Sequence, residues 1–247
     1  MRDDRTVLPS GLDTSQSVTV TQLTDTHLSA VNGLPASLRW LLGEIAGDPP
    51  DLVALTGDIV YEDPDDPDDR DFARAVFAGL PGPLVAIPGN HDIGFYGEDE
   101  TRPARLAAFV DTWGSDRFSV DAAGWRLVGT NAYLLGVPEH DVWLAESVAV
   151  DRPVAVFIHQ PVVDDTADGW EMPPPAAAAF HRVVDGADVR LVASGHRHRY
   201  ADRGTRVWAP STTIPGQADR PGDPRLGAVE FTFSCDGTFT HRLIQVP

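Results

Sequence analysis

Short apolar runs of strand length recur along the chain, and each ends in a turn-forming or polar residue. Segments of this form, which predict buried strands, are 18–24, 51–57, 83–89, 152–159 and 189–196. Two further segments, 117–131 and 227–246, each hold two apolar runs around a turn that contains glycine, and this pattern predicts β-hairpins.

Segments with a helical period separate the predicted strands. Apolar residues spaced for one helical face predict helices at 36–47, 71–80, 104–113 and 140–149, and an alanine-rich helix lies between 159 and 189. Alternating strands and helices, followed by hairpins, predict a layered α/β domain with mixed sheets. We expect a single domain over residues 17–247, after a flexible polar tail at residues 1–16.

The net charge of the chain argues against some classes of binding partner. The 247 residues include 37 acidic and 19 basic side chains, for a formal net charge of −18. Such a field repels nucleic-acid polymers and anionic membranes, so we expect neither as a partner. The single cysteine excludes an intramolecular disulfide and a cysteine-based zinc site. No signal-peptide pattern and no apolar run of about 18 residues is present, which predicts a cytoplasmic protein.

An acidic segment at 61–71, YEDPDDPDDRD, lies before the second predicted helix. We interpret it as a solvated loop whose aspartates cap that helix. A calcium site is a weaker interpretation, because the regular oxygen spacing and the glycine of a known calcium loop are missing.

Five predicted strands end in clusters of His, Asp or Asn. These residues are Asp25, His27, Asp58, Asn90, His91, Asp92, His159, His196 and His198. A single polar residue at a strand end says little, because such residues are common in structural roles. Strand ends are also where layered α/β folds form ligand sites, so five clusters together predict one shared site.

The donor types suggest a metal centre. Imidazole and carboxylate groups without thiolate suit borderline divalent ions such as Zn, Mn, Fe or Co. Four histidines and three oxygen donors are too many for one tetrahedral zinc, and they suit two ions about 3.5–4 Å apart that share a carboxylate. Two such ions would outweigh the charge of Asp25 and Asp58, so the site would attract a phosphate despite the acidic surface.

The clusters also form a recognisable series of motifs. In order they read Asp25-Thr26-His27, Gly57-Asp58, Gly89-Asn90-His91-Asp92, His159 and Gly195-His196-Arg197-His198. This series resembles the signature of the calcineurin-like metallophosphoesterase superfamily. The stretches QLTDTHL and PGNHD are most similar to its bacterial cyclic-nucleotide phosphodiesterase branch. The resemblance implies a four-layer αββα sandwich, with two mixed β-sheets flanked by helices.

The resemblance also implies a role for each motif residue. Asp25, His27 and His198 would hold one ion, Asn90, His159 and His196 the other, and Asp58 would bridge them. His91 would face the phosphoryl group, and Asp92 would orient His91. The ions would be two divalent or trivalent metals, Mn, Fe or Zn, and a metal-bridging hydroxide would attack the substrate in line.

Some features depart from the family pattern. Arg197 occupies a position where a smaller residue is expected, and Gln160 stands where relatives often have a second histidine. We expect Arg197 and Arg199 to face away from the metals and to pair with carboxylates. The chain has no room for a large cap domain, so surface loops would shape the site. Candidate substrate contacts in these loops are Tyr96, Asn131, Tyr133, His140, Asp164, Asp165 and Trp170.

Three functions are compatible with these residues. The first is hydrolysis of a small phosphodiester, such as a cyclic nucleotide or a glycerophosphodiester. The second is hydrolysis of a phosphomonoester on a small metabolite. The third is a catalytically inactive scaffold of the same fold, although such a scaffold should have lost ligands and this chain has all seven. The sequence leaves the oligomeric state open, with a dimer as one option.

Overall fold

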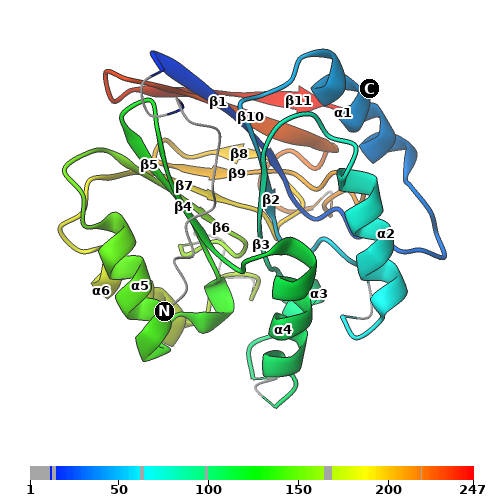
Figure 1. The fold of residues 1–247 in the computed structure, drawn as a ribbon, viewed down its shortest axis with the longest axis horizontal. Coiled ribbons are helices and arrows are strands. Elements are labelled where there is room, and N and C mark those ends of the chain that lie inside the picture. The colour runs from blue at the N-terminus through cyan, green and yellow to red at the C-terminus, as the bar shows by residue number, and fades with distance from the viewer. Residues whose placement is uncertain (1–11, 13–14, 62–63, 98–99, 164–168, 218) are drawn as a thin grey trace.

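The computed structural model describes residues 12, 15–61, 64–97, 100–163, 169–217 and 219–247. Its strands form two mixed sheets, which Figure 1 shows stacked on each other. The five-stranded sheet has the order β11-β10-β1-β2-β3 and consists of β1 (Ser17–Leu23), β2 (Leu52–Thr56), β3 (Leu84–Ile87), β10 (Gly227–Ser234) and β11 (Phe239–Gln245). The six-stranded sheet has the order β4-β5-β6-β7-β9-β8 and consists of β4 (Phe118–Ala122), β5 (Trp125–Thr130), β6 (Val154–Ile158), β7 (Val189–Ser194), β8 (Ala201–Asp202) and β9 (Arg206–Trp208).

Helices cover the outer faces of the two sheets. They are α1 (Ala36–Gly47), α2 (Pro67–Phe77), α4 (Arg102–Trp113), α5 (Pro138–Val148) and α6 (Pro174–Val184). The short helix α3 (Asn90–Ile93) and the 3₁₀ helix η2 (Ala132–Leu134) instead follow the ends of β3 and β5. In Figure 1, α1 and α2 lie on one side of the molecule, and α5 and α6 on the other. The expected four-layer arrangement of two mixed sheets flanked by helices is confirmed.

Two apolar clusters hold the layers together. β2 shows how one strand serves both, because alternate side chains point to opposite faces. Leu52 and Ala54 join the cluster that the two sheets share, whereas Val53 and Leu55 join the cluster beneath the helices. All five residues of β2 are buried, as expected for a parallel strand covered on both faces.

The acidic segment caps its helix with an aspartate as predicted, but less of it is loop than we expected. Helix α2 begins at Pro67, four residues earlier than expected, and the Asp66 side chain caps it by accepting a hydrogen bond from Asp68 N. Asp69 is only 5% exposed and accepts a hydrogen bond from Ala30 N at 2.7 Å. This part of the predicted solvated loop is therefore a helix that anchors the loop after β1.

Most of the predicted tail lies outside the described residues. Leu12 is described, and it packs against the inter-sheet cluster while its carbonyl accepts a hydrogen bond from Ala123 N at 2.8 Å. Gln16 O likewise accepts from Cys235 N at 2.9 Å. Among the described helices, none combines the length and apolar character that a membrane span needs. A cytoplasmic location stays a prediction.

Candidate metal centre

The motif residues meet where five parallel strands end. β1, β2 and β3 of one sheet and β6 and β7 of the other each run directly into one motif. The carboxyl ends of these strands lie together, which brings residues far apart in the sequence to one place. Hydrogen bonds join the loops after β1 and β2, from Asp25 N to Gly57 O and from His27 N to Asp58 O, both at 3.0 Å.

The backbone at the motifs is left-handed. Of the six described non-glycine residues with positive φ, five are predicted ligands, namely Asp25, His27, Asp58, His196 and His198. The Asp-x-His and His-x-His pairs are therefore not extended. A left-handed turn costs energy for a residue with a side chain, and such turns concentrate where the surrounding structure holds a functional geometry.

Two motif glycines keep space for the ligands. A Cβ atom on Gly89 would lie 2.2 Å from Asp58 Oδ1, and one on Gly195 would lie 2.0 Å from Thr24 Oγ1 and 2.7 Å from Asp25 Oδ2. All three distances are far below van der Waals contact, so the glycines allow the loops to approach each other closely.

The first cluster of donor atoms joins the β1 and β7 loops. Asp25, His27 and His198 offer atoms close enough to hold a metal ion. His198 Nε2 lies 3.3 Å from Asp25 Oδ1, and His27 Nε2 lies 3.1 Å from His198 Nε2. Two imidazole nitrogens that face each other this closely need a proton or a cation between them.

The second cluster joins the β2, β6 and β7 loops. Asp58, His159 and His196 also offer atoms close enough to hold an ion. His159 Nε2 lies 3.2 Å from Asp58 Oδ2 and 3.2 Å from His196 Nδ1. Asp58 Oδ2 also lies 4.0 Å from His27 Nε2 in the first cluster. Asp58 therefore lies between the two clusters.

Electrostatics at the site fit a bound cation. Asp25 and Asp58 are buried, and His198 Nε2 faces Asp25 Oδ1 at 3.3 Å. Burial opposes protonation of His159, but the Asp58 charge raises the pKa of His159 to about 9. Burial lowers the pKa of His196 to about 3. The raised pKa favours a proton on His159 beside Asp58, and a metal ion bound there would replace that proton.

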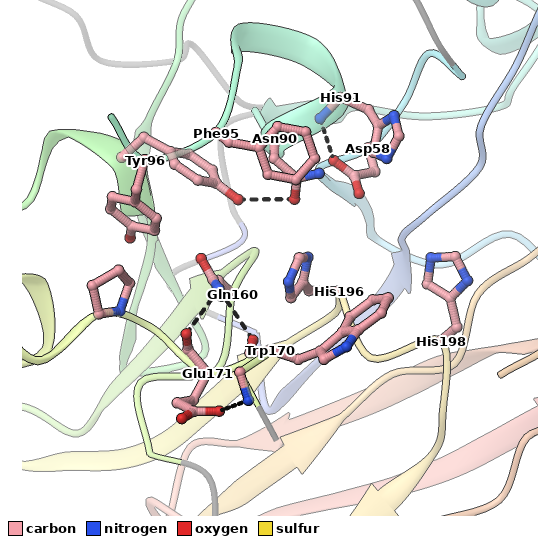
Figure 2. A pocket seen from close by; sticks show the side chains of 13 residues that line it. Asp58, Asn90, His91, Phe95, Tyr96, Gln160, Trp170, Glu171, His196 and His198 are labelled. Carbon is pink, nitrogen blue, oxygen red and sulfur yellow. Dashed lines mark hydrogen bonds between the residues drawn. The ribbon is translucent and has the colours of Figure 1, made fainter. Parts of the chain in front are cut away.

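Asn90 begins α3 and points toward the same space. Its side chain is 3% exposed, and its Oδ1 accepts a hydrogen bond from Tyr133 Oη at 3.0 Å. Figure 2 shows this bond next to Asp58 and His91. Amide oxygens are suitable ligands, and the tyrosine fixes the direction of this one.

His91 and Asp92 differ in their surroundings. His91 lines the pocket and donates its backbone N–H to Asp58 Oδ1 at 2.8 Å. Its ring also lies close enough to His27 and Asp58 to complete a third possible metal group. Asp92 accepts hydrogen bonds from Ile59 N, Val60 N and Gly89 N at 3.0, 3.2 and 2.8 Å. Both Asp92 oxygens thus tie the β2 and β3 loops together, and the expected orientation of the His91 ring by Asp92 stays a prediction.

A cavity of about 410 Å³ opens beside the donor atoms. Its lining residues are Asp58, Asn90, His91, Phe95, Tyr96, Tyr133, Gln160, Gly169, Trp170, Glu171, Pro173, His196 and His198. Three of the seven predicted substrate contacts, Tyr96, Tyr133 and Trp170, are among them. The volume is that of an ordinary small-molecule site.

Other predicted contacts lie elsewhere. Asn131 is buried and bonds to Asp116 and to the backbone of Tyr133. His140 is 1% exposed and bonds to Thr130 Oγ1, and burial lowers the pKa of His140 to about 4. Neither lines the pocket, so the prediction was wrong for both. Asp164 and Asp165 lie outside the described residues.

Sequence reasoning missed Phe95 and Glu171. Both line the pocket, but no motif or spacing marks either one. Gln160, which we noticed only as a departure from the family pattern, lines the pocket too. Its side-chain amide donates to the carbonyls of Trp170 and Glu171 at 3.1 and 3.0 Å, so it holds the loop that carries them.

Arg197 in the last motif and Arg199 directly after it do not line the pocket. Arg199 is 4% exposed and donates to the backbone carbonyls of Gln217, Pro221 and Gly222, so the carboxylate pairing that we expected for it was wrong. The Arg197 guanidinium lies 5.1 Å from the centroid of the Trp208 ring, a cation–π contact. Backbone carbonyls thus accommodate the charge of Arg199, and the Trp208 indole contacts the charge of Arg197.

The sequence profile of the calcineurin-like phosphoesterase family matches residues 18–200, which include every motif described above. The chain belongs to this family. Calcineurin-like phosphoesterases use dinuclear metal sites, and this chain brings together residue groups that could hold metal ions.

Two curated relatives illustrate the range of the family. One is the 3′,5′-cyclic adenosine monophosphate phosphodiesterase CpdA of Pseudomonas aeruginosa, 31% identical over 235 residues that cover 83% of this chain and 81% of the relative. The other is the serine/threonine-protein phosphatase CPPED1 of Danio rerio, 29% identical over 202 residues that cover 73% of this chain and 60% of the relative. The chain thus spans less than two thirds of the CPPED1 length.

A solved structure supports the fold. The purple acid phosphatase PPD1 of Lupinus luteus superposes with a TM-score of 0.72 at 16% identity, covering 94% of this chain and 53% of the phosphatase. At this identity the similarity concerns the fold alone.

We predict that Gly89→Ala displaces Asp58 and weakens metal uptake. A shift of about 1 Å in a catalytic group can lower turnover by about 100-fold, so we expect a loss of that size. Metal content by mass spectrometry and turnover of bis(p-nitrophenyl) phosphate measure both effects. Gly129→Ala in β5 is the matched control, because its Cβ would lie 2.1 Å from Phe118 Cε1, outside the pocket lining.

We expect the control to lower the melting temperature through overpacking while it keeps its metal. Wild-type metal content and turnover in Gly89→Ala would contradict the proposed crowding at Asp58.

Proposed function

We propose that this protein hydrolyses a small phosphodiester at a dinuclear metal centre. The observation that carries the proposal is the position of Asp58 between two donor clusters. Asp25, His27 and His198 would hold one ion, Asn90, His159 and His196 the other, and Asp58 would bridge them. The donors suit Mn, Fe or Zn, since they include imidazole and oxygen atoms but no thiolate.

The chain's own residues would position the substrate. When bound, the ions would supply Lewis-acid charge and lower the pKa of coordinated water. His91 stands on the pocket wall, where its ring could neutralise charge on the phosphoryl oxygens and give a proton to the leaving oxygen. The Asp58 hydrogen bond to His91 N fixes the start of α3, and thereby the place of this ring relative to the bridging carboxylate.

Charge in the pocket favours a diester over a monoester. Among the described lining residues, the carboxylates of Asp58 and Glu171 are present and no arginine is. A monoester carries nearly two negative charges at neutral pH, whereas a diester carries one. Glu171 would therefore repel a monoester more strongly. The similarity to a relative named as a cyclic AMP phosphodiesterase over most of both chains supports the same choice.

Hydrolysis of a phosphomonoester is the second candidate. The relatives named as serine/threonine-protein phosphatases favour it, and the same metal ligands would serve both reactions. We take the substrate to be a small molecule rather than a nucleic-acid polymer, because a net charge of −18 opposes binding of a polyanion.

We predict different effects for Asp58→Ala and His91→Ala. Loss of the shared carboxylate should remove bound metal and lower turnover by roughly 1,000-fold or more. Loss of the His91 ring should keep both ions and lower turnover by about 100-fold or more. Metal content and kcat, measured on the same preparations, separate the two results. His181→Ala, on the exposed side of α6, is the control for a histidine substitution.

If His91→Ala lost an ion, His91 would be a ligand, as its place near His27 and Asp58 permits, and our division of roles would be wrong.

A substrate panel tests the diester proposal. We expect kcat/KM for bis(p-nitrophenyl) phosphate to exceed that for p-nitrophenyl phosphate by about tenfold or more, because Glu171 opposes the second charge. Cyclic AMP and a glycerophosphodiester extend the panel, under loading with Mn, Fe or Zn. In Glu171→Gln, kcat/KM for the monoester should rise more than kcat/KM for the diester. A clear preference of the wild type for the monoester would overturn the proposal.

A further inference from the structure

We propose that Phe95 and Trp170 form an aromatic subsite that binds a planar aromatic part of the substrate, such as a nucleobase, beside the metal centre. The proposal rests on the function proposed above and narrows its substrate class. It favours nucleotide-like phosphodiesters over aliphatic ones such as glycerophosphodiesters.

The exposure of these two side chains is the first observation. The described chain leaves seven large hydrophobic side chains exposed, and five of them are valines. The two aromatic ones are Phe95, 51% exposed, and Trp170, 39% exposed, and both line the pocket. An aromatic ring left open to solvent inside a binding pocket has a face available for a ligand.

Each ring also touches a histidine of the centre. The Trp170 indole lies 5.3 Å from the His196 ring, and the Phe95 ring lies 5.9 Å from the His91 ring, measured between centroids. Figure 2 shows Trp170 across the pocket from Phe95, His91 and Asp58. A phosphate held at the metals would therefore place its ester substituent beside one or both rings.

Hydrogen bonds hold the loops that carry the rings. The Gln160 amide donates to the carbonyl of Trp170, and Met172 N donates to Pro161 O at 3.1 Å. On the other wall, Arg102 Nη2 donates to Phe95 O at 2.6 Å. Because these hydrogen bonds already fix the loops, ligand binding costs less free energy for loop ordering.

The rest of the lining favours a neutral planar group over other substituents. Glu171 disfavours a second phosphate, and the described lining offers no arginine to bind one. Tyr96 and Tyr133, whose ring centroids are 4.7 Å apart, extend the aromatic wall. Stacking on aromatic side chains suits any base, because every base has a π-face.

The test compares binding of two ligands to the metal-loaded protein by titration calorimetry. AMP and ribose 5-phosphate share the sugar and the phosphate, and only AMP carries a base. We expect the wild type to bind AMP about tenfold or more tightly than ribose 5-phosphate, as base stacking on one aromatic side chain supplies. In Trp170→Leu and in Phe95→Leu this ratio should fall toward one, while the affinity for ribose 5-phosphate stays within about twofold.

Two further variants keep the result interpretable. Trp170→Phe retains an aromatic face and should retain most of the preference for AMP. Val163→Ala removes an exposed apolar side chain that precedes the same loop and does not line the pocket. This variant should leave the affinities for AMP and ribose 5-phosphate unchanged. Unchanged metal content and circular dichroism in the leucine variants exclude loss of the fold as the cause of weaker binding.

The outcomes separate this proposal from the proposed function. Equal wild-type affinities for AMP and ribose 5-phosphate, or a preference that survives both leucine substitutions, would overturn the aromatic subsite even if diesters are hydrolysed. The aromatic subsite would also be overturned if Trp170→Leu lost more affinity for an aliphatic glycerophosphodiester than for AMP. A wild type that hydrolyses only monoesters would overturn the proposed function, whereas the calorimetric ratio would still report on the subsite.

Discussion

The buried carboxylate of Asp58 is the contact on which the rest of the site depends. Oδ1 accepts the His91 backbone N–H, and Oδ2 faces His159 and His27. One side chain at the end of β2 thereby joins the loops after β1, β3 and β6, which come from both sheets. A buried charge with such partners is stable only while they stay in place, so the carboxylate and the loops fix each other.

The two sheets determine where the motif loops begin, and the left-handed turns determine where the side chains of these loops point. Parallel strands deliver the motif loops to one edge of the sandwich, but an extended continuation would not aim every donor atom inward. Left-handed residues at Asp25, Asp58 and His196 redirect the chain over one or two positions. Gly89 and Gly195 then allow these turns to pack against one another, which places donors from separate loops within metal-binding distance.

The sequence predicted the elements and the convergence of the motif residues better than the lining of the pocket. Helix 36–47 has the predicted bounds because its apolar period is regular, whereas α2 begins earlier because Asp66 and Pro67 form a start that we read as loop. The short strands β8 and β9 carry too few residues to show a period. No motif marks Phe95 or Glu171, because the residues that line a pocket wall depend on the conformation of the loops. Asp92 belongs to a motif, but its carboxylate accepts hydrogen bonds from backbone N–H groups, which the motif alone does not predict.

A crystal structure of the metal-loaded protein, with anomalous scattering recorded at the metal edges, tests the central claim most directly. We predict two ions about 3.5–4 Å apart with Asp58 bound to both. One ion should contact Asp25, His27 and His198, and the other Asn90, His159 and His196. A single ion, or two ions bridged by another side chain with Asp58 bound to only one, would contradict the account.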